Sequence, residues 1–163
     1  MQYYNVYLLF GSNLGERTAN IANAITQLEN QGLQLLQLSS LYDTEPWGNT
    51  HQASFLNQAA EFDTGLSPQA LMKTILKVEQ EMGRTRTAKW EPRIIDIDIL
   101  FYGNLIVEEK DLKIPHPEVE KRKFALAPMA EIAPHFLHPR LKKSIRLLLS
   151  ECSDKLSVNF FQG

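Results

Sequence analysis

The chain opens with apolar residues at every second position of residues 4–10, which predicts a strand with one buried face. From residue 21 to residue 28 the apolar positions recur at spacings of three and four instead. That spacing is typical of an amphipathic helix, and Gly32 supplies its end. The first two predicted elements are therefore a strand and a helix.

Two further strands are predicted at residues 33–42 and 54–62, with a polar loop between them. Ser67 and Pro68 then begin a second helix. A serine side chain can accept a hydrogen bond from the free N–H groups of a first helical turn, and proline has no N–H to leave unpaired.

The clearest strand is predicted at residues 94–102. Gly103 and Asn104 follow it and predict a tight hairpin into residues 105–107. A last short helix is predicted from the apolar residues between 145 and 152. In order, the core elements are strand, helix, strand, strand, helix and strand.

This order predicts an α+β fold with a ferredoxin-like βαββαβ core. We expect a mostly antiparallel sheet with helices on one face, extended by a C-terminal hairpin and helices. A chain of 163 residues is long enough for one hydrophobic core, so residues 1–163 are expected to form a single domain. The arrangement hosts many functions and does not define one.

Composition excludes several classes of protein. A hydrophobic fraction of 44% is typical of a globular domain. A net charge of −2 argues against a broadly basic nucleic-acid face, although not against a local basic patch, and we expect no nucleic-acid partner. The single cysteine, Cys152, cannot form an intramolecular disulfide, which favours a reducing, cytoplasmic compartment. No apolar run approaches the roughly 18 residues of a membrane span, so no membrane partner is expected.

The candidate chemistry lies in residues 84–100. Strand alternation places Asp96 and Asp98 on one face and the isoleucines between them on the other. A pair of carboxylates can hold Mg²⁺ that also binds phosphate oxygens. Such a pair on its own is more often simply solvated.

A basic segment directly upstream changes this interpretation. Arg84, Arg86, Lys89 and Arg93 lie within ten residues of one another. A guanidinium group binds phosphate oxygens through two parallel hydrogen bonds, so arginines beside paired carboxylates predict phosphate chemistry. The chain has no Walker-type phosphate loop, and side chains and metal must therefore hold any nucleotide.

A second candidate site lies on the strand at residues 54–62. Phe55 and Asn57 share a face there, where a ring and an amide could stack on and hydrogen-bond a flat heterocycle. A core phenylalanine beside a structural asparagine would give the same pattern. Trp47 and Trp90 occupy polar segments, where a large ring more often serves binding than packing.

Short motifs run along nearly the whole chain: GSNLG at 11–15, YDTEPWG at 42–48, FLN at 55–57, E-x-x-x-GR-x-R at 79–86, W-x-PR-x-x-D-x-D-x-L at 90–100, PHP at 115–117 and EIAP at 131–134. Together they resemble the 6-hydroxymethyl-7,8-dihydropterin pyrophosphokinase family of folate biosynthesis. The two motifs within 79–100 are the most specific.

The resemblance implies transfer of the terminal diphosphate of ATP to the hydroxymethyl oxygen of the pterin, with release of AMP. It implies two Mg²⁺ ions bound by Asp96 and Asp98, and a catalytic set of Arg84, Arg93, Asp96 and Asp98. The implied contacts to ATP, the co-substrate, come from Glu79, Arg86, Trp90, Arg93, Ile99, Lys113, His116 and Arg122. Those to the pterin come from Thr44, Trp47, Phe55, Asn57, Trp90 and Phe124.

Three residues depart from the family's pattern, namely Glu45, Leu76 and Asp111. Leu76 and Asp111 stand where a polar or basic side chain is expected to contact ATP, and Lys113 can compensate for a lost contact. Two alternatives stay open. One is a ferredoxin-like RNA-binding module, although Asp96 and Asp98 would repel a phosphate backbone. The other is a magnesium-dependent phosphotransferase for a related heterocycle. A folding or interaction domain without catalysis is disfavoured, because that role would not require the grouping of aspartates and arginines. We expect a monomer whose partners are small-molecule substrates.

Overall fold

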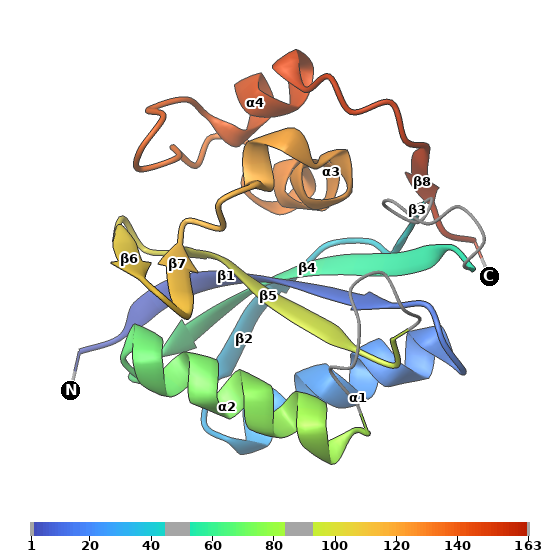
Figure 1. Cartoon of the computed structure of the whole chain (residues 1–163), viewed down its shortest axis with the longest axis vertical. Coiled ribbons are helices and arrows are strands. Elements are labelled where there is room, and N and C mark those ends of the chain that lie inside the picture. Colours follow the sequence, from blue (N-terminus) through green and yellow to red (C-terminus); the bar gives the residue numbers. More distant parts are fainter. Residues whose placement is uncertain (1, 45–52, 84–92, 163) are drawn as a thin grey trace.

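The computed structural model of the protein describes residues 2–44, 53–83 and 93–162. It forms an α+β fold with an antiparallel sheet, as predicted (Figure 1). The strands are β1 (Tyr4–Ser12), β2 (Gln34–Leu38), β3 (Tyr42–Thr44), β4 (Phe55–Thr64), β5 (Asp96–Tyr102), β6 (Val107–Glu109), β7 (Leu112–Ile114) and β8 (Val158–Phe160). The helices are α1 (Arg17–Asn30), α2 (Pro68–Glu81), the 3-10 turn η1 (Val119–Lys121), α3 (Lys123–Ile132) and α4 (Ile145–Glu151).

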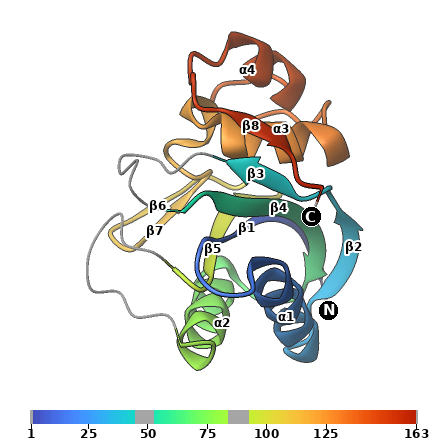
Figure 2. The same cartoon turned by 90° about the vertical axis from the view of Figure 1, so that its right-hand side faces the viewer.

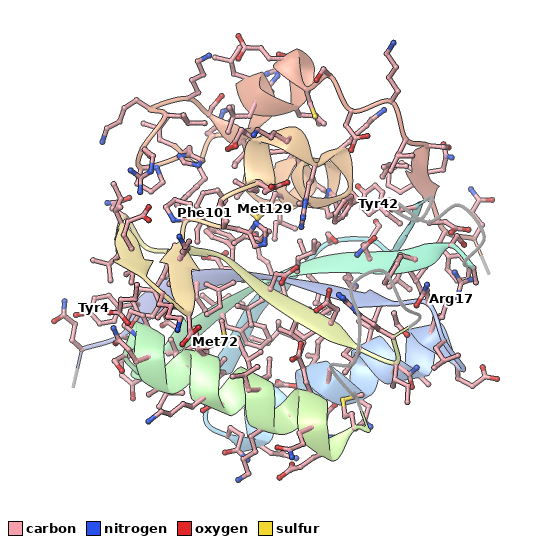
Figure 3. The ribbon with its side chains drawn as sticks, viewed as in Figure 1. Tyr4, Arg17, Tyr42, Met72, Phe101 and Met129 are labelled. Atoms are coloured by element: carbon pink, nitrogen blue, oxygen red, sulfur yellow. The ribbon has the colours of Figure 1, made fainter. Side chains whose placement is uncertain are left out.

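The main sheet has the order β5-β1-β4-β3-β8, and β2 also pairs with β4. Helices α1 and α2 cover one face, as the βαββαβ order predicts, whereas α3 and α4 lie over the opposite face (Figure 1). Figure 3 places Met72 on the α2 side of the sheet, and Phe101 and Met129 between the sheet and α3. The sheet is thus buried on both faces, by two separate hydrophobic clusters.

Local sequence explains where the second helix begins. The hydroxyl of Ser67 accepts a hydrogen bond from the Ala70 N–H at 3.1 Å, and Pro68 occupies the first turn. Leu71, Ile75 and Val78 then face the core at helical spacing. No helix among the described residues has both the length and the apolar character needed to cross a bilayer.

The strand predicted at residues 33–42 is divided in the structure, because β2 ends at Leu38 and β3 begins only at Tyr42. Ser39 interrupts the pairing. Its hydroxyl accepts the Ala59 N–H at 3.0 Å in place of a backbone carbonyl and donates to the Ser40 carbonyl at 2.7 Å. Serine side chains compete in this way with regular backbone pairing.

The hairpin predicted from Gly103 into residues 105–107 is wrong. Gly103 does turn the chain, with a φ of +51°, but the next hairpin forms between β6 and β7 instead. The outer edge of β5 has other partners, because the Glu79 carboxylate accepts from the Ile97 N–H and the His116 N–H donates to the Leu100 carbonyl. Those edge groups are therefore not available to a returning strand.

Candidate active site

The paired aspartates lie on β5 as predicted. Asp96 is opposite Gly11 and Asp98 is opposite Leu9 in the antiparallel pairing with β1. Ile97 is 3% exposed and belongs to the core on the α1 and α2 side. Since side chains alternate along a strand, both carboxylates belong to the other face of the sheet, and both are only partly buried.

Arg93 is held beside the first aspartate. Its guanidinium donates a hydrogen bond to the Asp96 carboxylate at 3.1 Å, and both side chains are about one quarter exposed. The main chain of Arg93 is fixed as well, because its N–H donates to the Asn13 side-chain oxygen at 2.7 Å and its carbonyl accepts from the Asn13 N–H at 3.0 Å. A cation and a carboxylate thus stand together at the start of β5.

Asn57 lies on the same face, two strands away. It is opposite Gly11 on β4, just as Asp96 is opposite Gly11 on β5, so the three residues form one line across the sheet. Directly opposite residues of an antiparallel pair point to the same face. The line therefore joins the carboxylate end of the face to its amide end.

Gly11 is required at the centre of this line. A Cβ atom on Gly11 would lie 2.9 Å from the Asn57 amide nitrogen and 3.7 Å from the Phe55 ring. Phe55 and Asn57 thus share a face next to the bare backbone of Gly11, as predicted. Any larger residue at position 11 would displace the amide.

Asn57 has unused hydrogen-bonding capacity. The side chain is 4% exposed, and its amide N–H₂ donates weakly to the Phe10 carbonyl at 3.4 Å. Its carbonyl oxygen is buried and has no hydrogen-bond partner among the described residues. Because a buried acceptor without a partner costs free energy, this oxygen is suited to a donor on a bound molecule.

Thr44 extends this polar edge. It is 2% exposed, lies opposite Phe55 on β3, and has a hydroxyl oxygen without a hydrogen-bond partner in the described part of the chain. Two buried polar side chains, Thr44 and Asn57, therefore frame the Phe55 ring. Neighbouring donors, acceptors and an aromatic ring suit a flat heterocycle that has polar edges.

His116 lies beside β5, to which its N–H is bonded. Its ring Nδ1 accepts the Glu118 N–H at 3.2 Å, so the neutral ring has its proton on Nε2. Burial, and then the positive charge of Arg122, lower the pKa of His116 to about 4. The imidazole is consequently an uncharged donor at neutral pH.

Arg122 and Phe124 come from the start of α3, on the same side of the sheet. The Arg122 guanidinium lies 3.8 Å from a carboxylate oxygen of Glu118 and 5.6 Å from the centre of the Phe124 ring. Phe124 is partly buried and packs against the cluster that includes Ala59 of β4. The structure thus brings these two expected residues to the face that holds Asn57.

Three expected residues lie elsewhere. The Ile99 side chain is 4% exposed within the core on the opposite face, so only its main chain is at the edge of β5. Glu79 is 2% exposed, and its carboxylate accepts the Ile97 N–H at 2.7 Å. Lys113 is exposed on β7 opposite Glu108. Expected residues outside the described part of the chain are Trp47, Arg84, Arg86 and Trp90.

Asn13 and Gly11 are the site residues that motif-by-motif assignment left out. Asn13 is 4% exposed and also donates to the Ala53 carbonyl at 3.1 Å, which joins the chain ahead of β4 to the start of β5. Both residues belong to GSNLG at 11–15, and neither has a charged side chain. The importance of Gly11 follows from the register of three strands, and that of Asn13 from its hydrogen bonds to Arg93 and Ala53.

The acidic groups of the face suit a metal that is shared with a ligand. No group of three or more His, Cys, Asp or Glu side chains within residues 2–44, 53–83 and 93–162 could enclose an ion. Mg²⁺ is commonly bound through one or two carboxylates, with the remaining positions filled by phosphate oxygens and water. Asp96 and Asp98 match that donor set.

Comparison with known proteins agrees with this geometry. A family model described as 7,8-dihydro-6-hydroxymethylpterin-pyrophosphokinase (HPPK) matches residues 7–134. The 2-amino-4-hydroxy-6-hydroxymethyldihydropteridine pyrophosphokinase of Aquifex aeolicus is 44% identical over 141 residues, which cover 86% of this chain and 88% of the relative. The protein of the same name from Bacillus subtilis is 40% identical over 127 residues, covering 77% and 76%.

Solved structures share the fold. The wild-type HPPK-DHPS of Plasmodium falciparum, in a crystal structure with pteroate, superposes with a TM-score of 0.76 at 16% identity over 92% of this chain. This chain covers 42% of that longer protein. From the family match, the identity to relatives of similar length and the fold, the chain belongs to the 7,8-dihydro-6-hydroxymethylpterin-pyrophosphokinase family.

Proposed function

We propose that the face between Asp96 and Asn57 is where this chain performs the reaction of its family. The chain transfers the terminal diphosphate of ATP to the hydroxymethyl group of 6-hydroxymethyl-7,8-dihydropterin, a step of folate biosynthesis. The line from Asp96 through Gly11 to Asn57 is the observation that supports this site most directly. Two strand spacings of about 4.8 Å separate its ends, which leaves room for a bicyclic ring beside a phosphate group.

The pterin binds at the amide end of the face. The unused carbonyl oxygen of Asn57 accepts from N–H groups on the pyrimidine half of the pterin. Thr44 adds contacts from β3, while Phe55 and Phe124 stack on the two sides of the ring. Trp47 and Trp90 complete the pterin contacts in this proposal.

ATP binds at the carboxylate end. Arg93, His116 and Arg122 supply donors to its phosphates and ribose, and His116 does so without a charge. Ile99 contributes its main chain at the edge of β5, not its buried side chain. The further ATP contacts that we propose come from Arg84, Arg86, Trp90 and the exposed Lys113, whereas the buried carboxylate of Glu79 acts indirectly by supporting β5.

Magnesium is the metal that the donor set favours. Asp96 and Asp98 hold Mg²⁺, and we propose two ions, since two carboxylates and a polyphosphate together can satisfy both. The metal supplies positive charge that offsets the charge of the transferred group. Arg93 supports the same charge balance and orients Asp96 through their 3.1 Å hydrogen bond.

The reaction needs alignment more than covalent help. The hydroxymethyl oxygen bonds to the β-phosphorus of ATP while the bond from that phosphorus to the α,β-bridging oxygen breaks, and that oxygen leaves on AMP. The hydroxyl proton passes to a carboxylate of the site, for which Asp96 is the candidate. Loss of one well-oriented charged contact in such a site slows turnover by about 100- to 1,000-fold.

Chromatography of the nucleotides tests this proposal. The protein is incubated with ATP, Mg²⁺ and 6-hydroxymethyl-7,8-dihydropterin, and AMP is measured with and without the pterin. The variants D96N and D98N are expected to lose nearly all pterin-dependent AMP. D63N, which changes an aspartate at the opposite end of β4, is the matched control and is expected to keep it.

Each other outcome has a definite meaning. Pterin-dependent ADP would show transfer of a single phosphate and contradict the reaction. Full activity of folded D96N and D98N would remove the metal assignment, as would undiminished turnover after Mg²⁺ is chelated. Turnover of a different heterocycle in preference to the pterin would favour the related phosphotransferase.

We further infer that the chain works as a cytoplasmic monomer and that residues 1–163 act as one domain. The single domain is supported by the C-terminal strand β8, which pairs with β3 next to β4 of the site. Sedimentation of the protein during turnover tests the monomer, and a single cooperative unfolding transition tests the domain. Fractionation of source cells tests the location.

A further inference from the structure

The chain between α4 and β8 runs in an extended form along the molecule. Figure 2 shows it passing from the C-terminal helices down to β8, which lies beside β3. Alternate residues from Cys152 to Val158 are partly buried, and those between them are exposed. We call residues 152–158 the C-terminal strap. It lies outside residues 7–134, the part that matches the family model.

Asp154 is bonded at both of its carboxylate oxygens. One oxygen accepts the Lys123 N–H at 3.1 Å, and the other accepts the Leu156 N–H at 3.0 Å. The second bond fixes the strap's own turn. The first joins the strap to the opening residue of α3, which is 31 positions earlier in the chain.

The start of α3 has no cap from its own sequence. Arg122 occupies the N-cap position but makes no side-chain cap hydrogen bond, and its carbonyl accepts from the N–H groups of Ala125 and Leu126. The Lys123 N–H is one of the donors that a helix leaves without a partner inside the helix. Asp154 supplies the acceptor from outside, and its negative charge suits the N-terminal end of a helix.

The capped turn includes residues proposed to touch both substrates. Arg122 precedes Lys123 and Phe124 follows it, and the Arg122 guanidinium lies over the Phe124 ring at 5.6 Å. An uncapped helix end frays first within its opening turn. Any fraying there would move the ring and the guanidinium away from the face that holds Asn57.

We propose that Asp154 is a positioning residue for the pterin, acting through the first turn of α3 to hold Phe124 over the sheet. This inference rests on the function proposed above for Phe124. A second contact of the same segment acts in the same sense, because β8 pairs with β3 from Tyr42 to Thr44. The C-terminal segment is therefore anchored both to α3, through Asp154, and to β3, through β8.

Binding and steady-state kinetics of three variants test the inference. D154A removes both acceptor oxygens, D154N keeps one acceptor oxygen without the charge, and S144A removes a different helix cap. The Ser144 hydroxyl accepts the Leu147 N–H at 3.1 Å at the start of α4, which contains no proposed substrate residue. S144A therefore controls for the general loss of stability.

The pterin dissociation constant is measured by fluorescence with a non-hydrolysable ATP analogue and Mg²⁺ present, so that it does not depend on turnover. For D154A we expect this constant and the pterin KM to rise by about 2- to 30-fold, the range typical of a lost helix cap. D154N is expected to lie between D154A and the wild type, because its single carbonyl oxygen can accept from the Lys123 N–H or from the Leu156 N–H but not from both. S144A is expected to unfold more easily but to bind the pterin like the wild type.

Unchanged pterin binding in D154A would overturn the inference, as would an equal loss of binding in S144A. If D154A does not fold, D154N and hydrogen exchange at the Lys123 N–H give the decision. If the Lys123 N–H of the wild type exchanges as fast as the N–H groups of an uncapped helix end, the inference is overturned. A wild type that binds the pterin without forming AMP would instead contradict the proposed reaction.

Discussion

The carboxylate of Glu79 accepts a hydrogen bond from the main-chain N–H of Ile97 at 2.7 Å, between the two aspartates of β5. Glu79 lies on α2 and is 2% exposed, so a buried acid from a helix on one face of the sheet pairs with the edge strand that presents Asp96 and Asp98 on the other. Helix α2 thus helps to fix where β5 lies at the edge of the sheet, and with it the position of Asp96 and Asp98.

Replacement of Glu79 is expected to affect both stability and turnover. E79A leaves the buried Ile97 N–H without an acceptor, which costs about 1–3 kcal/mol in the free energy of unfolding. We expect kcat to fall as well, because Asp96 and Asp98 flank the unpaired group. Urea unfolding and AMP formation measure the two effects.

E79Q keeps an acceptor oxygen in the same place and is expected to recover most of the lost stability. E81A changes an exposed glutamate of the same helix and serves as the control. If E79A is as stable as E81A, the bond to Ile97 does not support the edge strand.

Strict alternation in the sequence was enough to predict the aspartate pair. Each hydrophobic neighbour of Asp96 and Asp98 is buried, as the pattern from residue 94 onward requires. The same alternation places Phe55 and Asn57 on one face of their strand. A shift of the register by one residue would turn every side chain to the other face. These predictions depend on local spacing alone.

Other features depend on contacts between distant residues and leave no local pattern. The break after Leu38 arises from the Ser39 hydroxyl, which pairs with a strand about twenty positions away. The predicted hairpin after Gly103 failed because Glu79 and His116 occupy the edge that it would need. The turn propensity of Gly103 and its neighbours contains no information on contacts that distant residues make with the edge of β5.

Gly11 is expected to tolerate no side chain in the functional protein. In G11A the new methyl group would lie 2.9 Å from the Asn57 amide nitrogen and would displace the amide from the place where we propose that it meets the pterin. We expect the pterin KM to rise by about tenfold or more, equivalent to about 1.4 kcal/mol, with a smaller change in the ATP KM. Steady-state kinetics with each substrate varied in turn checks this.

G15A is the matched control for that change. Gly15 has a φ of +72°, so alanine there strains the backbone, but its Cβ would meet only the Asn20 side chain at 3.8 Å. It should lower the melting temperature and leave the pterin KM unaltered. A pterin KM that rises equally in both variants would mean that G11A acts through stability.

Asn13 is expected to matter for kcat although it is uncharged. N13A removes two hydrogen bonds. The Asn13 side chain accepts from the Arg93 N–H at 2.7 Å and donates to the Ala53 carbonyl at 3.1 Å. Since Arg93 orients Asp96, we expect kcat to fall by about 10- to 100-fold, less than the full loss of a charged contact. Quench measurements of AMP at saturating substrates test this.

N20A gives the comparison for Asn13. Asn20 donates to the Leu14 carbonyl at 2.9 Å and to the Ser12 hydroxyl at 3.2 Å, so its loss weakens the same turn without touching Arg93. We expect N20A to keep kcat within about twofold, the size of a change well under 1 kcal/mol. Equal kcat values in N13A and N20A would rule out a positioning role for Asn13.

The low pKa of His116 predicts a stability term that depends on pH. Its pKa is about 4 in the folded protein, against the ordinary 6.5, because burial and then Arg122 disfavour the charged ring. A lowered histidine pKa means that the unfolded chain binds the proton first, so stability falls as the pH drops from about 6.5 to about 4. The full effect is about 3 kcal/mol.

H116Q removes the titrating group and keeps a side chain that both donates and accepts. Its free energy of unfolding is expected to decline less than that of the wild type between pH 6.5 and pH 4, and to differ least in slope above pH 7. Urea unfolding across this range gives the comparison, and histidine NMR signals should show a neutral ring with its proton on Nε2. Parallel pH profiles in the two proteins would mean that His116 titrates normally, and the ATP phosphates would then meet a cation at pH 6 where we expect an uncharged donor.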